Sequence, residues 1–463
     1  MDYLPRKKLL ALYAALDRRT MAQRLEAAMA LASVRGMRYL DDAGRARLID
    51  LSLLPWVITT AQLQRFYGAV HAIAQGLYNL WPLYQSQPAV REVIRLSAEE
   101  ESWLRLMPRR SGFPMSVIGR LDCTAIYDQA NWWDDFVMLE PNAVGVGGVH
   151  YAPVGCSVLL DAFGDLLAKA VPGKWLRPAP DPRQLLLAEL KLVAKKAGRP
   201  LRSVAFLENT DFTTGTDEFG HLAAYFSRLG LKSVVADPRH LRISRGEIYA
   251  GKERIDFFYR DSELGEFMGM ESGGKKLTAL RLAVKEGRLI SSLAWELDQK
   301  SAWEIFTADR FARHFSTDQR RFFKKHILWT RLVREARVEG PQGRTIDLIP
   351  FIRRNREGYV LKPNTLFGGE GVTIGCEVTQ RHWERTLAKA LKGPQDYVFQ
   401  KLARIHSQTL PVKMRGQVQF VERSTVSGFY FNSTGIGLVG RFSPRTVVNV
   451  SQGGGLIPAL WLD

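Results

Sequence analysis

Cysteine is scarce in this chain, and long hydrophobic runs are absent. The 463 residues include three cysteines, Cys123, Cys156 and Cys376, which lie far apart and without CxxC spacing. This pattern excludes a disulfide framework and a cysteine-based zinc site. The longest stretches without charge, residues 141–160 and 424–440, contain several glycines and polar residues. The sequence therefore predicts no membrane-spanning segment.

Signals for export, repetition or disorder are also lacking. The opening MDYLPRKKLLALYAALDRR keeps charges through its apolar stretch and has no small-residue cleavage site. We therefore expect a cytoplasmic protein. No internal repeat, low-complexity tract or lysine-rich tail occurs.

Acidic residues are fewer than basic ones, 47 against 65, which gives a net charge of +18. Clustered lysines and arginines can neutralise the phosphates of a nucleic acid. A basic surface can equally be solvated and attract small anionic substrates. Since no DNA- or RNA-binding motif is present, the second interpretation is favoured and nucleic acid is an unlikely partner.

The pattern of apolar residues changes several times along the chain. Its length predicts two or three packed units. Apolar residues recur at helical spacing in the first part, short β-rich runs begin at Val117, and a βαβ pattern follows from Arg202. We place the boundaries at 1–114 (helical), 115–200 (strands), 201–275 (a doubly wound α/β domain), 276–340 (helical) and 341–463 (strands and glycine loops).

One lysine precedes a glycine-rich turn in the segment YVLKPNTLFGGEGVTIG, residues 359–375. Glycines let backbone N–H groups approach phosphate oxygens, and an ammonium adds a point charge there. The pattern GxxxxGK[ST] is absent, so this is not a Walker loop. A plain hairpin turn remains the alternative. The candidate phosphate-binding residues are Lys362, Gly368, Gly369 and Gly371.

A second candidate is the strand DYVFQKL, residues 396–402, whose polar end could offer backbone groups to an adenine edge. An ordinary half-buried strand is the alternative. The residues concerned are Gln400, Lys401 and Leu402.

Two pairs of polar residues have the two-residue spacing that places side chains on one face of a strand. Glu140 and Asn142 offer hard oxygen ligands of the kind that Mg²⁺ prefers. Arg120 and Asp122 form a similar pair one strand earlier. Surface salt bridges would produce the same patterns. His150 is the nearest candidate acid or base, with a hydrogen-bonded loop histidine as its alternative.

Together these segments resemble the ATP-grasp superfamily, and more closely its circularly permuted branch, which includes eukaryotic-type glutathione synthetases and bacterial circularly permuted ATP-grasp proteins. Glu140-Pro-Asn142 precedes the lysine–glycine loop, as in that branch. The tail segments GIGLVGR and VVNVSQGGG are similar to the closing strands of the bacterial group. The resemblance spans roughly residues 115–463 and implies an α/β protein with α+β lobes. Its fold would be a circularly permuted ATP-grasp fold with a helical N-terminal region and an inserted doubly wound domain.

The resemblance implies roles for particular residues and a cofactor, MgATP. Lys300 would join Lys362 at the phosphates under the glycine loop. Glu140, Asn142 and Glu422 would hold Mg²⁺. Arg120, Asp122 and Arg441 would face the acceptor carboxylate or acyl phosphate. The residues bordering the nucleotide would be Gln400, Lys401, Leu402 and Asn449.

The chain departs from the family pattern in two places. Glu370 puts a carboxylate into the glycine loop, and LIPALW follows Gly455 where the bacterial group has a lysine-aspartate-threonine-tryptophan run. The leading hypothesis is an ADP-forming ligase that joins a carboxylate to an amine on amino-acid or peptide-like substrates, with a homodimer left open. A catalytically silent nucleotide-binding regulator and a basic nucleic-acid-binding protein are the alternatives.

Overall fold

The computed structural model describes residues 5–41, 44–108, 115–124, 127, 131–211, 215–366, 368–393, 396–414, 416–448, 450 and 453–462. Buried hydrophobic side chains within these ranges form three clusters. The largest surrounds a central sheet, the second lies in the domain that begins near residue 201, and the third lies in a small lobe built by residues 330–401.

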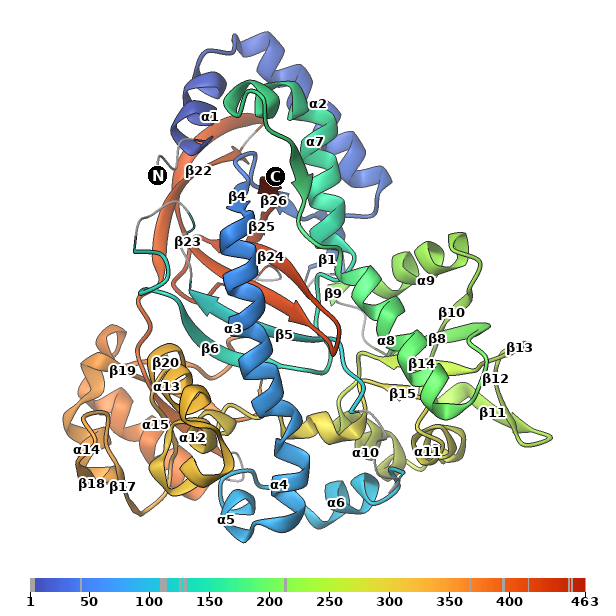
Figure 1. Cartoon of the computed structure of the whole chain (residues 1–463), viewed down its shortest axis with the longest axis vertical. Helices are drawn as coiled ribbons and strands as arrows, with labels where there is room; N and C mark the ends of the chain where they lie inside the picture. The colour runs from blue at the N-terminus through green and yellow to red at the C-terminus, as the bar shows by residue number, and fades with distance from the viewer. Residues whose placement is uncertain are drawn as a thin grey trace.

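A seven-stranded sheet forms the centre of the molecule (Figure 1). Its strand order is β3-β25-β24-β23-β5-β6, and β22 pairs with β23 outside that path. All neighbours are antiparallel except β3 and β25. The strands are β3 (Asp50–Leu51), β5 (Gly119–Thr124), β6 (Val137–Asn142), β22 (His406–Met414), β23 (Gln417–Phe431), β24 (Ile436–Ser443) and β25 (Gly455–Ile457). Strands far apart in the sequence thus meet at the middle of this sheet.

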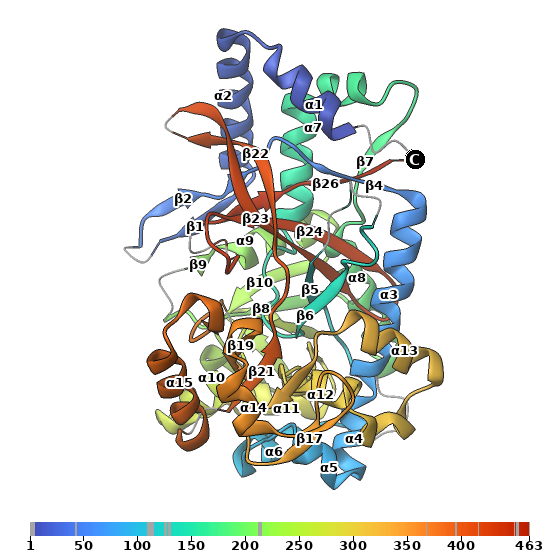
Figure 2. The ribbon, with the colours of Figure 1, turned by 90° about the vertical axis from the view of Figure 1, so that its left-hand side faces the viewer.

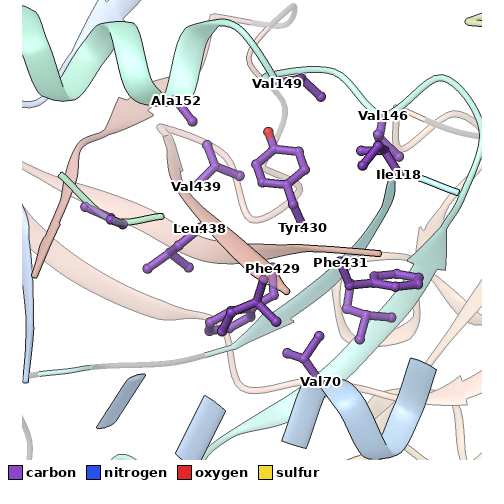
Figure 3. Close-up of a cluster of buried hydrophobic side chains, with 14 of the residues drawn as sticks. Val70, Ile118, Val146, Val149, Ala152, Phe429, Tyr430, Phe431, Leu438 and Val439 are labelled. Carbon is purple, nitrogen blue, oxygen red and sulfur yellow. The ribbon is translucent and has the colours of Figure 1, made fainter. Parts of the chain in front are cut away.

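The two faces of the central sheet differ because side chains alternate along a strand. Phe429 and Phe431 point toward helix α3 (Thr60–Tyr78), and Tyr430 between them points the other way (Figure 3). The Phe66 and Phe429 ring centroids are 4.6 Å apart, so α3 seals the apolar face. The opposite face is free to carry polar groups.

The N-terminal region is helical in large part but is joined to the central sheet by strands. Its strand β3 pairs with β25, and β4 (Trp56–Thr59) pairs with β26 (Ala459–Leu462). Periodicity did not reveal these pairings, because strands of two to four residues are too short to show a pattern. The other elements are α1 (Pro5–Ala14), α2 (Arg18–Val34), β1 (Arg38–Leu40), β2 (Ala46–Leu48), α4 (Leu80–Ser86), α5 (Pro88–Arg91) and α6 (Ala98–Leu104).

Helix α7 (Tyr151–Ala170) packs beside α1 and α2 over the end of the sheet (Figures 1 and 2). By length and composition alone it could cross a membrane, although 67% of its apolar window is buried inside the protein. The core helix of a soluble protein passes the same test, so this helix is weak evidence for a membrane span. β7 (Leu176–Pro178) and α8 (Pro182–Ala197) follow, and α8 ends at Gly198 with a φ of 62°.

The inserted domain has a parallel sheet with the order β10-β8-β14-β15. The strands predicted at SVAFLEN, KSVVADP and RIDFFYRD form, and Gly230 ends helix α9 with a φ of 83°. The sheet extends beyond the expected boundary at residue 275, because β15 (Leu289–Ile290) completes it. The remaining elements are β8 (Ser203–Leu207), β9 (Gly215–Thr216), α9 (Glu218–Arg228), β10 (Lys232–Ala236), β11 (Leu241–Ser244), β12 (Glu247–Ala250), β13 (Glu253–Arg254), β14 (Phe257–Arg260), α10 (Leu264–Ser272) and α11 (Thr278–Lys285).

The small lobe carries a four-stranded sheet with the order β16-β21-β19-β20. Leu361 and Phe399 lie on the face that packs against Trp383 of helix α15. The strands and helices of this lobe and its approach are α12 (Ala302–Thr307), α13 (Thr317–His326), β16 (Thr330–Leu332), β17 (Arg337–Glu339), β18 (Thr345–Asp347), α14 (Leu348–Arg354), β19 (Tyr359–Pro363), β20 (Thr373–Ile374), α15 (Gln380–Lys392) and β21 (Tyr397–Lys401). The other face of this sheet is turned toward β6, where Gln400 Nε2 donates to the Leu139 carbonyl at 3.0 Å.

Candidate active site

Lys362 lies on the inner face of the small lobe's sheet. It pairs in register with Val398, on the face opposite Leu361 and Phe399. Its ammonium makes no hydrogen bond and no ion pair with the residues that the structure describes. Burial lowers the pKa of Lys362, Glu140 opposes that shift, and Lys300 adds to it. The Lys362 side chain therefore lies near other charged groups without a direct partner among the described residues.

Lys300 is positioned by the polypeptide that follows Lys362. The Asn364 side chain accepts from the Ser301 N–H at 2.8 Å and donates to Gln299 Oε1 at 2.9 Å. The Lys300 ammonium donates to the Leu366 carbonyl at 2.6 Å and lies 3.6 Å from Glu140 Oε2. Three separate segments thus bring both predicted lysines and the predicted metal ligand Glu140 together.

The glycine loop follows these lysines and folds back on β19. Gly368, Gly369 and Gly371 have φ values of 66°, 79° and 68°, which side-chain-bearing residues rarely adopt. A Cβ on Gly369 would clash with Val447, and one on Gly371 would lie 2.7 Å from Pro363 Cγ. The loop therefore needs glycine for its conformation and for its close packing. Glu370 is exposed to solvent.

Arg120, Asp122 and Arg441 form a buried charged group on the polar face of the central sheet. Arg120 Nε donates to Asp122 Oδ1 at 2.8 Å, and Arg441 Nη2 lies 2.8 Å from Asp122 Oδ2. Burial alone would raise the pKa of Asp122, but the two guanidinium groups lower it to about 2. A Cβ on Gly428 would lie 2.7 Å from Arg120 Cδ, so glycine there makes room for the arginine. The structure therefore brings the predicted residues Arg120, Asp122 and Arg441 into contact.

Glu140 and Asn142 share a face of β6 opposite Asp122 and Arg120, as their spacing predicted. The Asn142 amide donates to the Arg120 carbonyl at 3.4 Å, which leaves its oxygen without a partner among the described residues. No group of three His, Cys, Asp or Glu side chains suited to a metal occurs in the described ranges. Two oxygen ligands fit a Mg²⁺ ion that is held mostly by substrate phosphates, and the uncompensated Lys362 fits those phosphates.

Glu422 does not belong to this group. It is exposed on β23, opposite Thr409, whose hydroxyl donates to it. Along β23 it lies six residues before Gly428, the position paired with Asp122, which is a distance of about 20 Å in an extended strand. The prediction that Glu422 is a third metal ligand is therefore wrong. The predicted nucleotide contact Asn449 lies outside the described residues.

Several donors of the proposed adenine edge make contacts within the protein. Gln400 is 1% exposed, and its amide donates to the Leu139 carbonyl and to Thr330 Oγ1. The N–H of Lys401 donates to the Trp329 carbonyl, and that of Leu402 to the Gly358 carbonyl at 2.8 Å. These donors hold the small lobe's sheet together and join it to β6, so they are not available to a nucleobase in this structure.

His150 is a buried structural histidine. Its Nε2 lies 3.1 Å from the Arg35 carbonyl, and its ring stacks on His221 with centroids 4.9 Å apart. Burial lowers the pKa of His150 to about 4. It is therefore neutral near pH 7 and unsuited to deliver a proton there.

Three half-buried carboxyl groups lie where the inserted domain meets the central sheet. We call Glu208, Glu263 and Asp298 the acidic edge. Burial raises the pKa of Glu208 to about 7, with Asp261 adding to the shift, and that of Glu263 to about 8, with Glu296 adding. Burial also raises the pKa of Asp298 to about 7. This is the region where ligands bind in open α/β sheets, outside the carboxyl ends of the strands.

Sequence reasoning missed several residues that organise the site. Asn364 follows the Lys-Pro pair directly, and only its contacts with residues 299–301 reveal its role. Tyr430 and Glu218 were not singled out, because their partners lie far away in the sequence. A polar residue inside an otherwise apolar strand, such as Tyr430 in SGFYFN, was the available signal.

No model of a known protein family matches the sequence, and no curated protein matches it. Among solved structures, a glutathione synthetase-like effector from Globodera pallida, in its apo form, is similar with a TM-score of 0.63 and 10% identity, over 96% of this chain and 97% of that one. A proposed gamma-glutamylcysteine synthetase from Methylobacillus flagellatus KT matches with a TM-score of 0.38 and 11% identity, over 82% of this chain and 86% of that one. A TM-score this low supports no conclusion. The first match shows the fold: this chain has the glutathione synthetase-like fold that its motifs predicted.

Proposed function

We propose that this protein is an ATP-dependent ligase that joins a carboxylate to an amine, with ADP and phosphate as products. The observation that carries the proposal is the convergence of Lys300, Lys362 and Glu140 from three segments, beside a loop that requires glycine. Two lysines beside one carboxylate leave positive charge in excess, which suits a site that binds phosphates and Mg²⁺ together.

The residues can be assigned to the steps of such a reaction. MgATP would supply the γ-phosphoryl group that activates the acid. Lys300 and Lys362 would stabilise charge on the transferred group, with Glu140 and Asn142 holding the metal. Arg120 and Arg441, fixed by Asp122, would orient the carboxylate and stabilise the oxyanion that develops when the amine attacks. No side-chain nucleophile is needed.

The order of the segments supports the circularly permuted form of the ATP-grasp fold. β6, with Glu140, precedes β19, with Lys362, although the two meet through the Leu139–Gln400 contact. Substrates of the amino-acid or peptide class fit two charged regions of the protein. The arginines Arg120 and Arg441 suit a carboxylate, and the acidic edge suits an amino group. A cytoplasmic location remains part of this proposal.

The direct test is the release of ADP from MgATP in the presence of pools of amino acids and small peptides. We expect ADP and phosphate in at least one pool, and trapping of the acyl phosphate by hydroxylamine when the acid is present without an amine. AMP and pyrophosphate as the main products would exclude this mechanism, since the proposed charges are aimed at the terminal phosphate.

A nucleotide-binding protein without catalysis is the second candidate. The observation that favours it is the exposed carboxylate of Glu370 inside the glycine loop, beside the place where the transferred phosphate would lie. Saturable MgATP binding without ADP release in any pool would select this candidate.

A further inference from the structure

The glycine-rich turn between β6 and α7 touches the charged face of the central sheet. Gly145 and Gly148 have φ values of 61° and 92°. A Cβ on Gly148 would clash with the Tyr430 hydroxyl, and one on Gly145 would lie 2.9 Å from the Asp261 carbonyl. The turn is therefore enclosed between the central sheet and the inserted domain.

A carboxylate from the inserted domain holds this turn. Glu218, in the first turn of α9, is 5% exposed. Its Oε1 accepts from the His150 N–H at 2.5 Å, and its Oε2 accepts from the Gly148 N–H at 2.8 Å. Two backbone donors on one carboxylate fix the orientation of the Gly147–Gly148 and Val149–His150 peptides, the first of which carries the Gly147 carbonyl.

The same turn presents one carbonyl to the charged face. The Gly147 oxygen accepts from Arg120 Nη1 at 2.8 Å and from the Tyr430 hydroxyl at 2.9 Å. Arg120 in turn binds Asp122, and Asp122 pairs with Arg441. A continuous chain of contacts therefore runs from α9 of the inserted domain to both arginines.

We propose that Glu218 is a positioning residue: through the Gly147 carbonyl it sets the direction of the Arg120 guanidinium, and so joins the inserted domain to the carboxylate-binding arginines. The role assigned to Arg120 rests on the proposed function. The positioning claim itself rests on the contacts alone. Burial raises the pKa of Glu218 to about 7, and the two N–H groups that it accepts oppose this rise because they favour the carboxylate.

The test compares Glu218→Gln with a matched variant, Glu189→Gln. Glu189 is also fully buried, has its pKa raised to about 7 by burial, and accepts a backbone N–H from Val117. No contact joins it to Arg120 among the described residues. Glutamine keeps the volume but can accept only one of the two N–H groups that Glu218 accepts. Hydrogen exchange measures the result without any need for catalysis.

We expect exchange in residues 143–150 to be about 10-fold faster in Glu218→Gln than in wild type, and unchanged there in Glu189→Gln, whose own backbone contact is at Val117. In the ligase assay, kcat/KM for the acid should fall about 10-fold to 100-fold, with the KM for MgATP nearly unchanged. The double variant Glu218→Gln/Arg120→Lys should lose no more kcat/KM for the acid than Arg120→Lys alone, because both substitutions act through one chain of contacts.

Unchanged exchange of residues 143–150 in Glu218→Gln, or equal acceleration there in Glu189→Gln, would overturn the positioning claim. Additive losses in the Arg120→Lys double variant would do the same. If wild type releases no ADP in any pool, the proposed function fails, and the exchange result still decides whether Glu218 positions the turn.

Discussion

Two charged regions lie within this protein, and they treat their carboxyl groups in opposite ways. On the central sheet, Asp122 is buried between two guanidinium groups that lower its pKa to about 2. Along the acidic edge, burial and neighbouring carboxylates raise the pKa of Glu263 to about 8. The first region has two guanidinium groups for one carboxylate, and the Arg441 Nε is buried without a hydrogen-bond partner among the described residues. The second crowds carboxyl groups together, and a cation such as a substrate amine would favour their charged form.

The paired charges on the central sheet form the rigid part of the site. Paired charges on neighbouring strands fix each other's geometry, and removing one partner leaves the other buried and uncompensated. Crowded carboxyls of like charge take up protons instead, so their charge depends on pH and on what binds.

Replacing Arg120 with alanine should have the largest effect. Arg120→Ala leaves Asp122 buried with one partner, so the free energy of unfolding should fall by about 3 kcal/mol. Urea denaturation measures it. Arg353→Ala is the control, because its 3.3 Å ion pair with Glu384 is exposed and should be worth less than about 1 kcal/mol. Equal losses in the two variants would remove the distinction between paired and surface charges.

Gly428→Ala should crowd the same region from the backbone. The new Cβ would lie 2.7 Å from Arg120 Cδ and 2.9 Å from Val439 Cγ1, and such overpacking costs about 2 kcal/mol. Thermal unfolding monitored by circular dichroism measures it. Gly164→Ala in α7 has no neighbour within 4 Å of the new Cβ, so it should be neutral or stabilising. A neutral Gly428→Ala would mean that Arg120 has room to move.

The acid limb of the stability profile should depend on Asp122. Its pKa is lowered from 3.8 to about 2, so its contribution is present above pH 3.8 and is lost as the pH falls toward 2. The loss amounts to about 2 kcal/mol over that window. Asp122→Asn should lack this part of the slope when the free energy of unfolding is measured from pH 5 to pH 2. Parallel profiles for wild type and variant would contradict the paired-charge account.

The acidic edge should give a slope of the opposite sign. The pKa of Asp298 is raised from 3.8 to about 7, so its folded-state advantage is full below pH 3.8 and is lost as the pH rises toward 7. Because the group is partly solvated, we expect about 1 kcal/mol. Asp298→Asn keeps an acceptor for the Ala143 N–H and should flatten the profile between pH 4 and pH 7.5. Asp318→Asn, at an exposed position, should leave the slope of the profile unchanged.

Local patterns in the sequence predicted much of this site. The E-x-N spacing and the R-x-D spacing each describe two residues of one strand, and the structure places each pair on one face as expected. The predicted strand with Lys362 also forms, and the glycine turn follows it. The fold could be predicted because these segments occur in a recognisable order. Lys300 and Lys362 then meet through Asn364, which no local pattern reveals.

The misses come from contacts between distant segments. Glu422 was placed at the metal, but β23 runs 15 residues and carries it well beyond the site. Backbone groups of residues 400–402 are predicted to border a nucleobase, and of these the Leu402 N–H already donates to the Gly358 carbonyl. Helix α7 was not anticipated, because an apolar run rich in glycine suits a strand as well as a buried helix.

Calorimetry of MgATP binding to wild type and to Lys362→Met is the direct test of whether Lys362 contacts the phosphates of MgATP. Lys362 has no partner among the described residues, so its loss should leave the fold intact, and relief of the buried charge should keep stability equal or higher. We predict that wild type binds MgATP and that Lys362→Met binds it at least about 10-fold more weakly, as expected for loss of a charge-assisted contact. The exposed Lys392→Met on α15 should bind like wild type. Equal affinity in wild type and Lys362→Met, or no binding by wild type, would contradict the account.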